Sequence, residues 1–475
     1  MTVSRRRFLA GATGASVLTL AACTPGPPTP RPPTPGPTAT TSLPVDPLRP
    51  IAVRRSSWTG DGFTQGGTSF IPVGETPDRR DDLAAPVDDR IFFAGEATSR
   101  RAPSSLEGAR ESGERVADEL LAAATEGERI AVVGAGLAGA IAARRIRDAG
   151  FDVIVIEARE RVGGRIRTID GDGQQPEELG ALWVYEGRDD TLLAALTEAG
   201  VETEPLPRTR VRAPDRELDA ALAEEAAGFI AGAAAAAAAE VAFDVPVSGA
   251  IALLGPLADA STIDTLSATT PSPREAAALF TDSLGIVTGA EARRISTRYA
   301  LDELPSGDRM LSVGGLARYM DGLLDGIDVL LSSAVTTVRW NVDAVSLRLG
   351  TGESFTVGRV IISVPLGVLK GDGITFEPEL PLVNRRGIAA LATGDLETVW
   401  VRYAEPTWPD DAELWSLVPT DGGPDIRTWV NLHAVTGDPV LVGLLSGAEA
   451  RRFAGLTDAE ALEAVIEALA PFLDG

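Results

Sequence analysis

The chain has 475 residues, which is enough to bury a large core and suggests two or three domains. Its formal net charge is −25, from 68 acidic and 43 basic residues, and such a charge repels phosphate backbones. Nucleic acid is therefore excluded as an expected partner.

The first 50 residues carry the features of a targeting signal and a linker. Residues 4–9 read SRRRFL, an apolar run follows to residue 22, and residues 20–23 read LAAC, which resembles a bacterial lipobox. The run is shorter than the about 20 residues that cross a bilayer, so we interpret residues 1–23 as a Tat lipoprotein signal rather than an anchor helix. Residues 24–50 are proline-rich and predict an extended linker.

These features predict a location. We expect export by the Tat route and a lipid on Cys23 that tethers the protein to the outer face of the cytoplasmic membrane. No later segment is expected to span a membrane, so the lipid would be the only membrane contact.

Three residue types with reactive side chains occur once each, as Cys23, Lys370 and His433. A single cysteine allows no internal disulfide, and once lipidated it is not available for a covalent bond to a cofactor. No metal-ligand cluster is visible, so we expect no metal. His433 lies in the apolar segment TWVNLHAV, which predicts a strand, and we expect it to be an ordinary packed or hydrogen-bonded residue rather than a base.

Residues 51–124 contain two further distinctive segments. Residues 55–74 read RSSWTGDGFTQGGTSFIPVG, and residues 92–112 read FFAGEATSRRAPSSLEGARES. The second segment predicts a strand, a turn at Gly95 and Glu96, and a helix that begins at Ser105 and Leu106 and runs to about residue 124.

Residues 128–161 predict a strand, a tight turn, a helix and a second strand, which is a βαβ unit. The turn reads GAGLAG: Gly134 permits the turn, Gly136 lets the backbone approach a pyrophosphate, and Gly139 allows close helix packing. Glu157 lies 23 residues after Gly134, where a carboxylate can accept hydrogen bonds from a ribose. The pattern predicts a dinucleotide site, with Ala135 and Ala138 in the same loop; a coincidental glycine turn is the alternative.

The next residues read ARERVGGRIRT at 158–168 and ELGALWV at 178–184. Together with the segments above, they resemble the flavin amine oxidase family; a solvated arginine-rich loop is the alternative. The resemblance implies non-covalent FAD. Its implied binding residues, beyond those of the glycine turn and Glu157, are Arg159, Gly164, Arg165, Leu182, Trp183, Val335, Gly95, Glu96, Ser105 and Leu106.

The resemblance also implies the fold class. We expect an α/β protein with an FAD-binding Rossmann-like domain of the glutathione-reductase type and a mixed α+β substrate domain. The FAD domain would comprise residues 51–124, 129–190 and 307–372, and the substrate domain an alanine-rich helical insert at 191–300 together with 373–475.

The order of these pieces is rotated relative to the family. The segment at 92–112 resembles the part that closes the family's fold, yet here it precedes the glycine turn. We therefore predict a circular permutant in which residues 125–128 join the former last helix to the former first strand. The new ends, near Pro47 and Gly475, should lie close together.

The resemblance implies oxidation of an amine to an imine, with hydride passing to flavin N5 and O2 as acceptor, giving H2O2. Four positions depart from the family in three respects. Thr398, in GDLETVWV, stands where the family has a lysine that assists the reaction with oxygen. Thr68 and Ser105 stand where an aromatic cage flanks the amine, and Trp183 stands where related amino-acid oxidases have an arginine.

Two alternative functions follow from these departures. The first is an FAD-dependent dehydrogenase of a non-amine substrate with a quinone or protein as acceptor. The second is a flavin-binding lipoprotein whose catalytic site has decayed.

Overall fold

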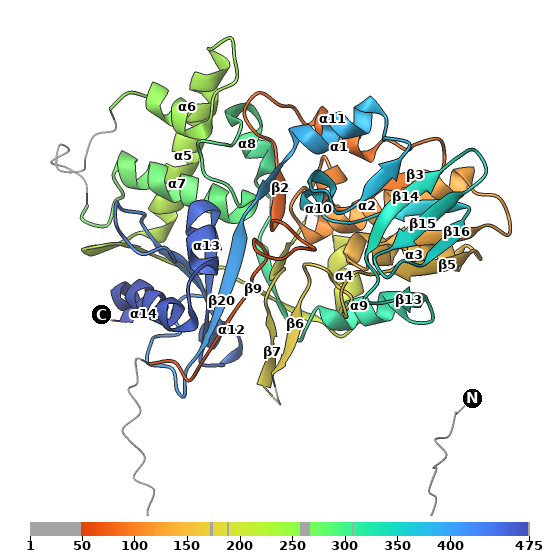
Figure 1. Ribbon diagram of the computed structural model, residues 1–475. Coiled ribbons are helices and arrows are strands. Elements are labelled where there is room, and N and C mark those ends of the chain that lie inside the picture. Colours follow the sequence, from red (N-terminus) through yellow and green to blue (C-terminus); the bar gives the residue numbers. More distant parts are fainter. Residues whose placement is uncertain (1–48, 172–173, 188–189, 257–266, 306, 474–475) are drawn as a thin grey trace, which may run out of the picture. The chain divides into compact units, whose positions relative to one another are not determined.

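Five parallel strands form the central sheet of one half of the described chain (Figure 1). The computed structural model describes residues 49–475 except 172–173, 188–189, 257–266, 306 and 474–475. The strand order is β13 (Asp328–Leu330), β5 (Asp152–Ile156), β4 (Arg129–Val133), β17 (Arg359–Ile362) and β3 (Ile91–Phe93). The strands are short runs of branched apolar residues, as is typical of a parallel sheet buried on both faces.

The two faces of this sheet are covered differently because side chains alternate along each strand. Phe92, Val132 and Ile361 face one core. That core is shared with the helices α2 (Leu106–Ala123), α3 (Leu137–Asp148), α4 (Asp190–Glu198) and α9 (Ala317–Leu324).

The other face packs on a four-stranded sheet with order β16 (Ser354–Val357), β15 (Val345–Leu349), β14 (Val335–Trp340) and β18 (Thr375–Glu377). The helices α1 (Asp78–Ala84), α10 (Leu366–Lys370) and α11 (Leu382–Ala390) and the 3-10 helix η1 (Glu96–Thr98) lie beside it.

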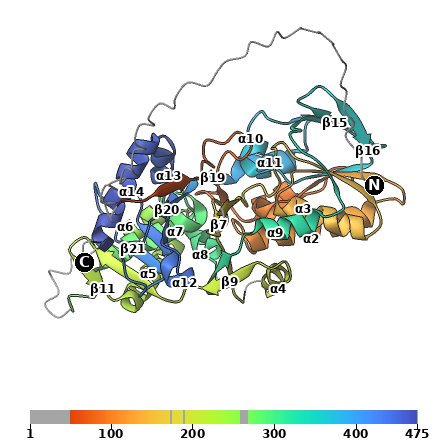
Figure 2. The same cartoon turned by 90° about the horizontal axis from the view of Figure 1, so that it is seen from below.

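A seven-stranded sheet forms the core of the other half (Figure 2). Its order is β1 (Ala52–Arg55), β20 (Leu396–Arg402), β23 (Val440–Ser446), β22 (Thr428–Asn431), β21 (Leu414–Leu417), β10 (Thr209–Ala213) and β11 (Arg216–Leu218). All neighbours are antiparallel except β10 and β21. The helices α12 (Leu432–Thr436), α13 (Gly447–Ala454) and α14 (Asp458–Leu473) accompany it.

Small ribbons connect the two halves. They are β2 (Thr68–Phe70) with β19 (Ala392–Gly394), β6 (Thr168–Gly171) with β7 (Gln174–Glu178), and β12 (Arg309–Val313) between β8 (Trp183–Tyr185) and β9 (Glu202–Pro205). The expected mixed α/β class is thus confirmed.

The helical group contains α5 (Ala220–Ala239), α6 (Val247–Leu253), α7 (Pro273–Thr288) and α8 (Thr297–Glu303). At the start of α7, Ser272 and Glu275 form a capping box. Residues 202–218 differ from the expected helical insert, because they form β9, β10 and β11. The segment TRVRA alternates charged and apolar residues, which is a strand pattern that the surrounding alanine-rich composition obscured.

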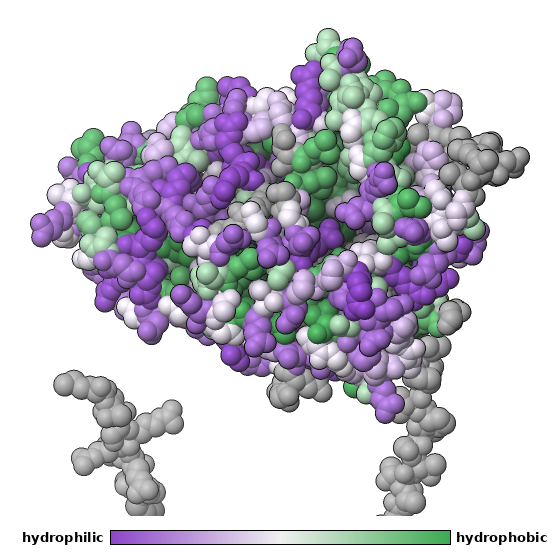
Figure 3. Space-filling model, turned by 180° about the vertical axis from the view of Figure 1, so that it is seen from behind, coloured by the Kyte–Doolittle hydropathy of each residue, from purple (hydrophilic) through white to green (hydrophobic). Residues whose placement is uncertain are grey.

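Helix α5 is the one described helix that is long and apolar enough to cross a membrane, by length and composition only. This differs from the expectation that no segment after the signal would pass this test. Its residues Ile230 and Ala231 pack in one core with Phe280 of α7. Three large apolar residues on or beside α5 and α6 are exposed: Phe229, Phe243 and Leu253. Apolar surface is visible on the helical group at the upper right of Figure 3.

The first described strand lies against the last helix. Arg55 Nη2 of β1 is 2.9 Å from Asp458 Oδ1 of α14, and Arg55 Nη1 donates to the carbonyl of Phe453 at 3.3 Å. Val53 packs on the core that contains Phe472. Pro47 and Gly475, whose proximity the sequence predicts, lie outside the described residues.

Candidate active site

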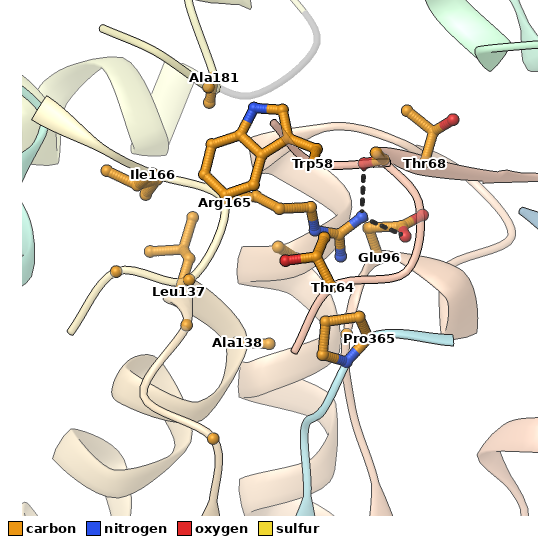
Figure 4. Close-up of a pocket in the computed structure, with 18 of the residues that line it drawn as sticks. Trp58, Thr64, Thr68, Glu96, Leu137, Ala138, Arg165, Ile166, Ala181 and Pro365 are labelled. Atoms are coloured by element: carbon orange, nitrogen blue, oxygen red, sulfur yellow. Dashed lines mark hydrogen bonds and ion pairs between the residues drawn. The ribbon is translucent and has the colours of Figure 1, made fainter. Parts of the chain in front are cut away.

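A cavity of about 360 Å³ lies between the carboxyl ends of the parallel strands and the seven-stranded sheet. Figure 4 shows part of its lining, with Arg165 near Trp58 and Glu96. Nearly all the residues expected from the sequence line this one cavity: Thr68, Gly95, Glu96, Ser105, Leu106, Gly134, Gly136, Ala138, Glu157, Arg159, Gly164, Arg165, Leu182, Trp183, Val335 and Thr398.

The glycine turn brings a helix N-terminus to the cavity. Strand β4 ends at Val133, Gly134 adopts φ +106°, and Gly136 is the N-cap of α3. A Cβ on Gly136 would meet no atom within 4 Å, so the backbone is open there. Unpaired N–H groups and the helix dipole make such a terminus a site for the phosphates of a dinucleotide.

Ala135 and Gly139 do not line the cavity, although both belong to the expected set. A Cβ on Gly139 would lie 2.1 Å from the carbonyl oxygen of Gly134 and 2.6 Å from Ser363 Oγ, so this glycine permits close packing of α3 on the turn. Ser363, which sequence reasoning missed, donates to the carbonyls of Val133 and Gly134, both at 3.0 Å. It thereby secures the turn from β17.

Glu157 is held at the end of β5 by backbone amides. Its Oε2 accepts from Ala135 N at 2.8 Å and its Oε1 from Arg159 N at 2.9 Å. A carboxylate has about four acceptor positions, so Glu157 can still accept hydrogen bonds from ribose hydroxyls.

Arg159 joins the βαβ unit to the segment at 55–74. Its guanidinium donates to both carboxylate oxygens of Asp61, with Nη1–Oδ2 2.6 Å and Nη2–Oδ1 2.5 Å, and to Thr64 Oγ1 at 2.6 Å. Burial by itself raises the pKa of Asp61. The hydrogen bonds and positive charge of Arg159 outweigh this effect, so the pKa of Asp61 lies below its usual value. The guanidinium also lies 5.5 Å from the centre of the Phe63 ring.

Arg165 and Glu96 form a second ion pair across the cavity wall. Arg165 Nη1 donates to Glu96 Oε1 at 2.9 Å and to the carbonyl of Gly67 at 2.7 Å (Figure 4). Glu96 Oε2 accepts from Ser69 Oγ at 2.6 Å and from Ser104 N at 2.9 Å. Burial raises the pKa of Glu96, but Arg165 and the hydrogen bond from Ser69 hold it below its usual value.

A second helix N-terminus reaches the same cavity. Ser105 is the N-cap of α2: its Oγ accepts from Gly108 N at 3.1 Å and donates to the carbonyl of Ala102 at 2.8 Å. The hydroxyl of Ser105 therefore stabilises the helix end. Leu106 and Ala109 on the first turn line the cavity.

The two threonines that depart from the family pattern both donate their hydroxyl protons to backbone carbonyls. Thr68 Oγ1 donates to Thr288 O at 2.6 Å, and Thr398 Oγ1 to Leu179 O at 3.2 Å. Each hydroxyl can thus offer the cavity only lone pairs. Trp58 Nε1 also donates to Leu179 O, at 2.8 Å.

Lys370 and His433 lie apart from the cavity lining. Lys370 Nζ donates to the carbonyls of Ile388, Ala389 and Leu391 at 2.7–2.8 Å, which secures the end of α11. Burial lowers the pKa of this amine.

His433 lies in the short helix α12 rather than in the expected strand, and its Nδ1 is 3.3 Å from Gly437 O. Gly437, with φ +83°, ends that helix. Among the residues that the structure describes, no group of three or more His, Cys, Asp or Glu could hold a metal ion.

Several lining residues were missed from the sequence. Trp58 lies in a quoted family segment and Glu397 precedes Thr398, so both carried a positional signal. The apolar ones had no signal, because a residue facing a cavity has the same pattern as one in a core: Ile286, Val287, Pro305 and Leu444.

Comparison with known proteins identifies the family. The model of the flavin containing amine oxidoreductases matches residues 39–121 and 137–474. The chain belongs to this family. It is therefore an FAD-dependent oxidoreductase, with FAD bound non-covalently.

Among its relatives, polyamine oxidase 4 of Oryza sativa subsp. japonica is 28% identical over 365 residues, which cover 72% of each chain. Polyamine oxidase 2 of Arabidopsis thaliana is 26% identical over 355 residues and 70% of each chain. A structure of wild-type putrescine oxidase bound to putrescine is 22% identical with a TM-score of 0.54, covering 74% of this chain and 82% of that one, and shows the same fold.

The residues present fit FAD. Cβ atoms on Gly95 and Gly136 would meet no atom within 4 Å, so the backbone is accessible at both of these lining positions. The N-terminus of α3 can hold the phosphates and Glu157 a ribose. The N-terminus of α2 can stabilise negative charge on the reduced ring system.

Proposed function

We propose that this protein oxidises an amine to an imine, with transfer of hydride to flavin N5 and with O2 as the electron acceptor, giving H2O2. The observation that carries the proposal is that one cavity joins the FAD cradle to an apolar end lined by Leu182, Ile286, Val287 and Leu444. FAD supplies the hydride acceptor. The apolar walls exclude water and orient the carbon that carries the amine.

The experiment is reduction of the purified flavoprotein by a panel of amines without oxygen, followed by admission of oxygen with detection of peroxide. Loss of the flavin absorbance on adding an amine, and peroxide after oxygen, are the expected results. A folded protein that rejects FAD, or a flavin that no amine reduces, would contradict the proposal.

A second candidate is a dehydrogenase whose acceptor is a quinone or a protein. The observation that favours it is the hydroxyl of Thr398, which donates to Leu179 O, while Lys370 is held by three carbonyls away from the cavity. Among the described lining residues, the cations are Arg159 and Arg165. Flavin reduction by substrate without peroxide release supports this candidate.

We also propose that the protein is a circular permutant of its family. Three contacts support this proposal. Strand β3 pairs in parallel with β17 at the edge of the sheet, α2 packs on α3, and the N-termini of both helices line one cavity. The short link at 125–128 joins α2 to β4.

For location, we propose Tat export and a lipid on Cys23, on the sequence features of residues 1–23. Metabolic labelling with a tagged fatty acid tests this: wild type should be labelled and found with the membrane. A Cys23→Ala variant should be unlabelled, and equal labelling of both would contradict the proposal.

A further inference from the structure

The apolar end of the cavity belongs to the half of the protein built on the seven-stranded sheet. Leu444 of β23 is the register partner of Thr398 of β20, and both line the cavity. Leu182, Leu444 and the partly buried Ile286 share one hydrophobic core. Thr68 donates to the carbonyl of Thr288, next to Val287. These contacts place the two threonines and the four aliphatic residues on one wall.

The described lining residues include three carboxylates, Glu96, Glu157 and Glu397, and each accepts hydrogen bonds from neighbouring protein groups. Glu96 is paired with Arg165, and Glu157 accepts from two amides in the nucleotide cradle. Glu397 directly precedes Thr398 on β20.

Glu397 is 1% exposed, and its carboxylate is bound by the segment that follows β1. Oε2 accepts from Ser56 Oγ and from Trp58 N, and Oε1 accepts from Thr59 N at 2.9 Å. Its neighbour Thr398 points to the opposite side of the strand, because side chains alternate. The hydrogen bonds of Glu397 thus hold its carboxylate beside residues 56–59, on the face of β20 opposite to Thr398, and the other two carboxylates lie in the cofactor cradle.

This arrangement separates two kinds of amine. The reacting nitrogen must be neutral when its carbon gives up hydride: the C–H bond breaks with its electron pair going to the flavin, the C=N bond forms, and the N–H proton passes to solvent. A second ammonium group on a diamine stays charged throughout. Burying it against Ile286, Val287 and Leu444 without a carboxylate is strongly unfavourable.

We propose that the substrate is a monoamine with an apolar carbon chain, and that diamines and polyamines are rejected. This rests on the proposed amine oxidation. The proposed selectivity for monoamines over diamines is inferred from this chain's own cavity wall and not from the polyamine oxidases that it resembles.

The test uses the purified holoenzyme and a matched pair, 1-aminopentane and 1,5-diaminopentane, together with their N-methyl derivatives. Rates of flavin reduction are measured without oxygen in a stopped-flow instrument. We expect the rate constant of flavin reduction divided by Kd to be at least about 100-fold higher for the monoamine than for the diamine. An apolar pocket discriminates against an added polar group by about this factor. Equal or faster reduction by the diamine would overturn the inference and leave amine oxidation standing.

Reduction by none of the four amines, with a flavin that dithionite still bleaches, would overturn both proposals.

A charge swap adds a second, independent measurement. Val287 lines the cavity and is half-buried, so Val287→Asp places a carboxylate there, and Val287→Asn is its neutral control of similar shape. For each variant, the rate constant of flavin reduction divided by Kd is compared for the diamine and the monoamine. The ratio of the diamine value to the monoamine value should be at least about 10-fold higher in Val287→Asp than in Val287→Asn. An equal ratio in the two variants would contradict the inference.

Discussion

Arg165 and Glu96 lie 2.9 Å apart, although they come from opposite sides of the glycine turn in the sequence. The pair joins the segment that follows β3 to the loop that follows β5, and it does so beside the cavity. Its two members also hold the carbonyl of Gly67 and the hydroxyl of Ser69. The cofactor site is therefore assembled from both segments.

Replacing Arg165 should weaken both the fold and cofactor binding. Arg165→Ala leaves Glu96 buried without its main charge partner, and we expect a loss of roughly 3 kcal/mol in the free energy of unfolding. FAD should also bind at least about 10-fold more weakly. Urea unfolding and FAD titration of the apoprotein measure the two effects. Arg165→Ala combined with Glu96→Gln is the control, since it removes both charges and should recover part of the stability. Unchanged stability in the single variant would contradict the structural role.

Glu178 gives the protein a pH dependence. Its side chain is buried, Oε1 accepts from Leu316 N and Thr168 Oγ1, and in the described part of the chain Oε2 has no hydrogen-bond partner. Burial raises its pKa to about 7, against the two hydrogen bonds, which lower it. Because the pKa of Glu178 is raised in the folded protein, its protonated carboxyl contributes full stability below about pH 4.5, which is the pKa in the unfolded chain. This stability is lost as the pH rises through about 7, where the buried carboxyl must ionise.

Glu178→Gln should remove this dependence. The amide keeps an acceptor for Leu316 N and carries no charge, so the variant should gain on the order of 3 kcal/mol relative to wild type between pH 4.5 and pH 8. Unfolding of both proteins in urea at several pH values gives the difference. A difference that stays constant with pH, or that moves in favour of wild type at high pH, would show that Glu178 is ionised in the fold.

The cofactor cradle was predictable because its determinants are local. Gly134, Gly136 and Glu157 act through turn geometry and spacing, and the structure brings them to one cavity. The apolar end was not predictable: Ile286 and Leu444 are separated by more than 150 residues, and nothing in an aliphatic side chain tells a cavity wall from a core.

The role of Ser105 shows a different limit. The sequence predicted that a helix begins at Ser105 and that this residue lies at the cofactor; the hydroxyl itself caps α2 because serine before a helix satisfies an orphan amide. The partner of Arg159, Asp61, lies 98 residues away and could not be assigned before the fold was known. Local patterns thus predicted the elements of the cofactor cradle but not β9, β10, β11 or α12, and the pairings needed tertiary structure.

Thr398→Lys tests the origin of oxygen reactivity. The family resemblance implies that a lysine at this position assists the reaction with oxygen, and a positive charge stabilises the negative charge that develops on reduced oxygen. We expect Thr398→Lys to increase the rate of flavin reoxidation by at least about 10-fold, with Thr398→Met as a neutral control of comparable length. The rate is measured by mixing reduced enzyme with oxygenated buffer. Equal rates in the two variants would exclude charge at this position as the controlling factor.

Reversal of the predicted permutation is the most direct test of the chain order. The link between α2 and β4 contains the exposed residues Glu126 and Gly127, the latter with φ +83°, so the chain can be opened there without breaking an element. At the other junction, Val53 of β1 packs on the core that contains Phe472 near the end of α14, so a glycine-rich linker should join residue 475 to residue 49.

We expect the rearranged chain, starting at Gly127, to fold and to bind one FAD with the affinity of wild type, because every strand pair and both helix N-termini at the cavity are retained. Flavin content, the absorbance spectrum and thermal unfolding measure this. The control opens the same circular order between Val133 and Gly134, inside the turn that positions α3, and should yield no flavoprotein. If opening at Gly127 also abolished folding, β1 and α14 would not be the natural joining point, and the permutation proposal would fail.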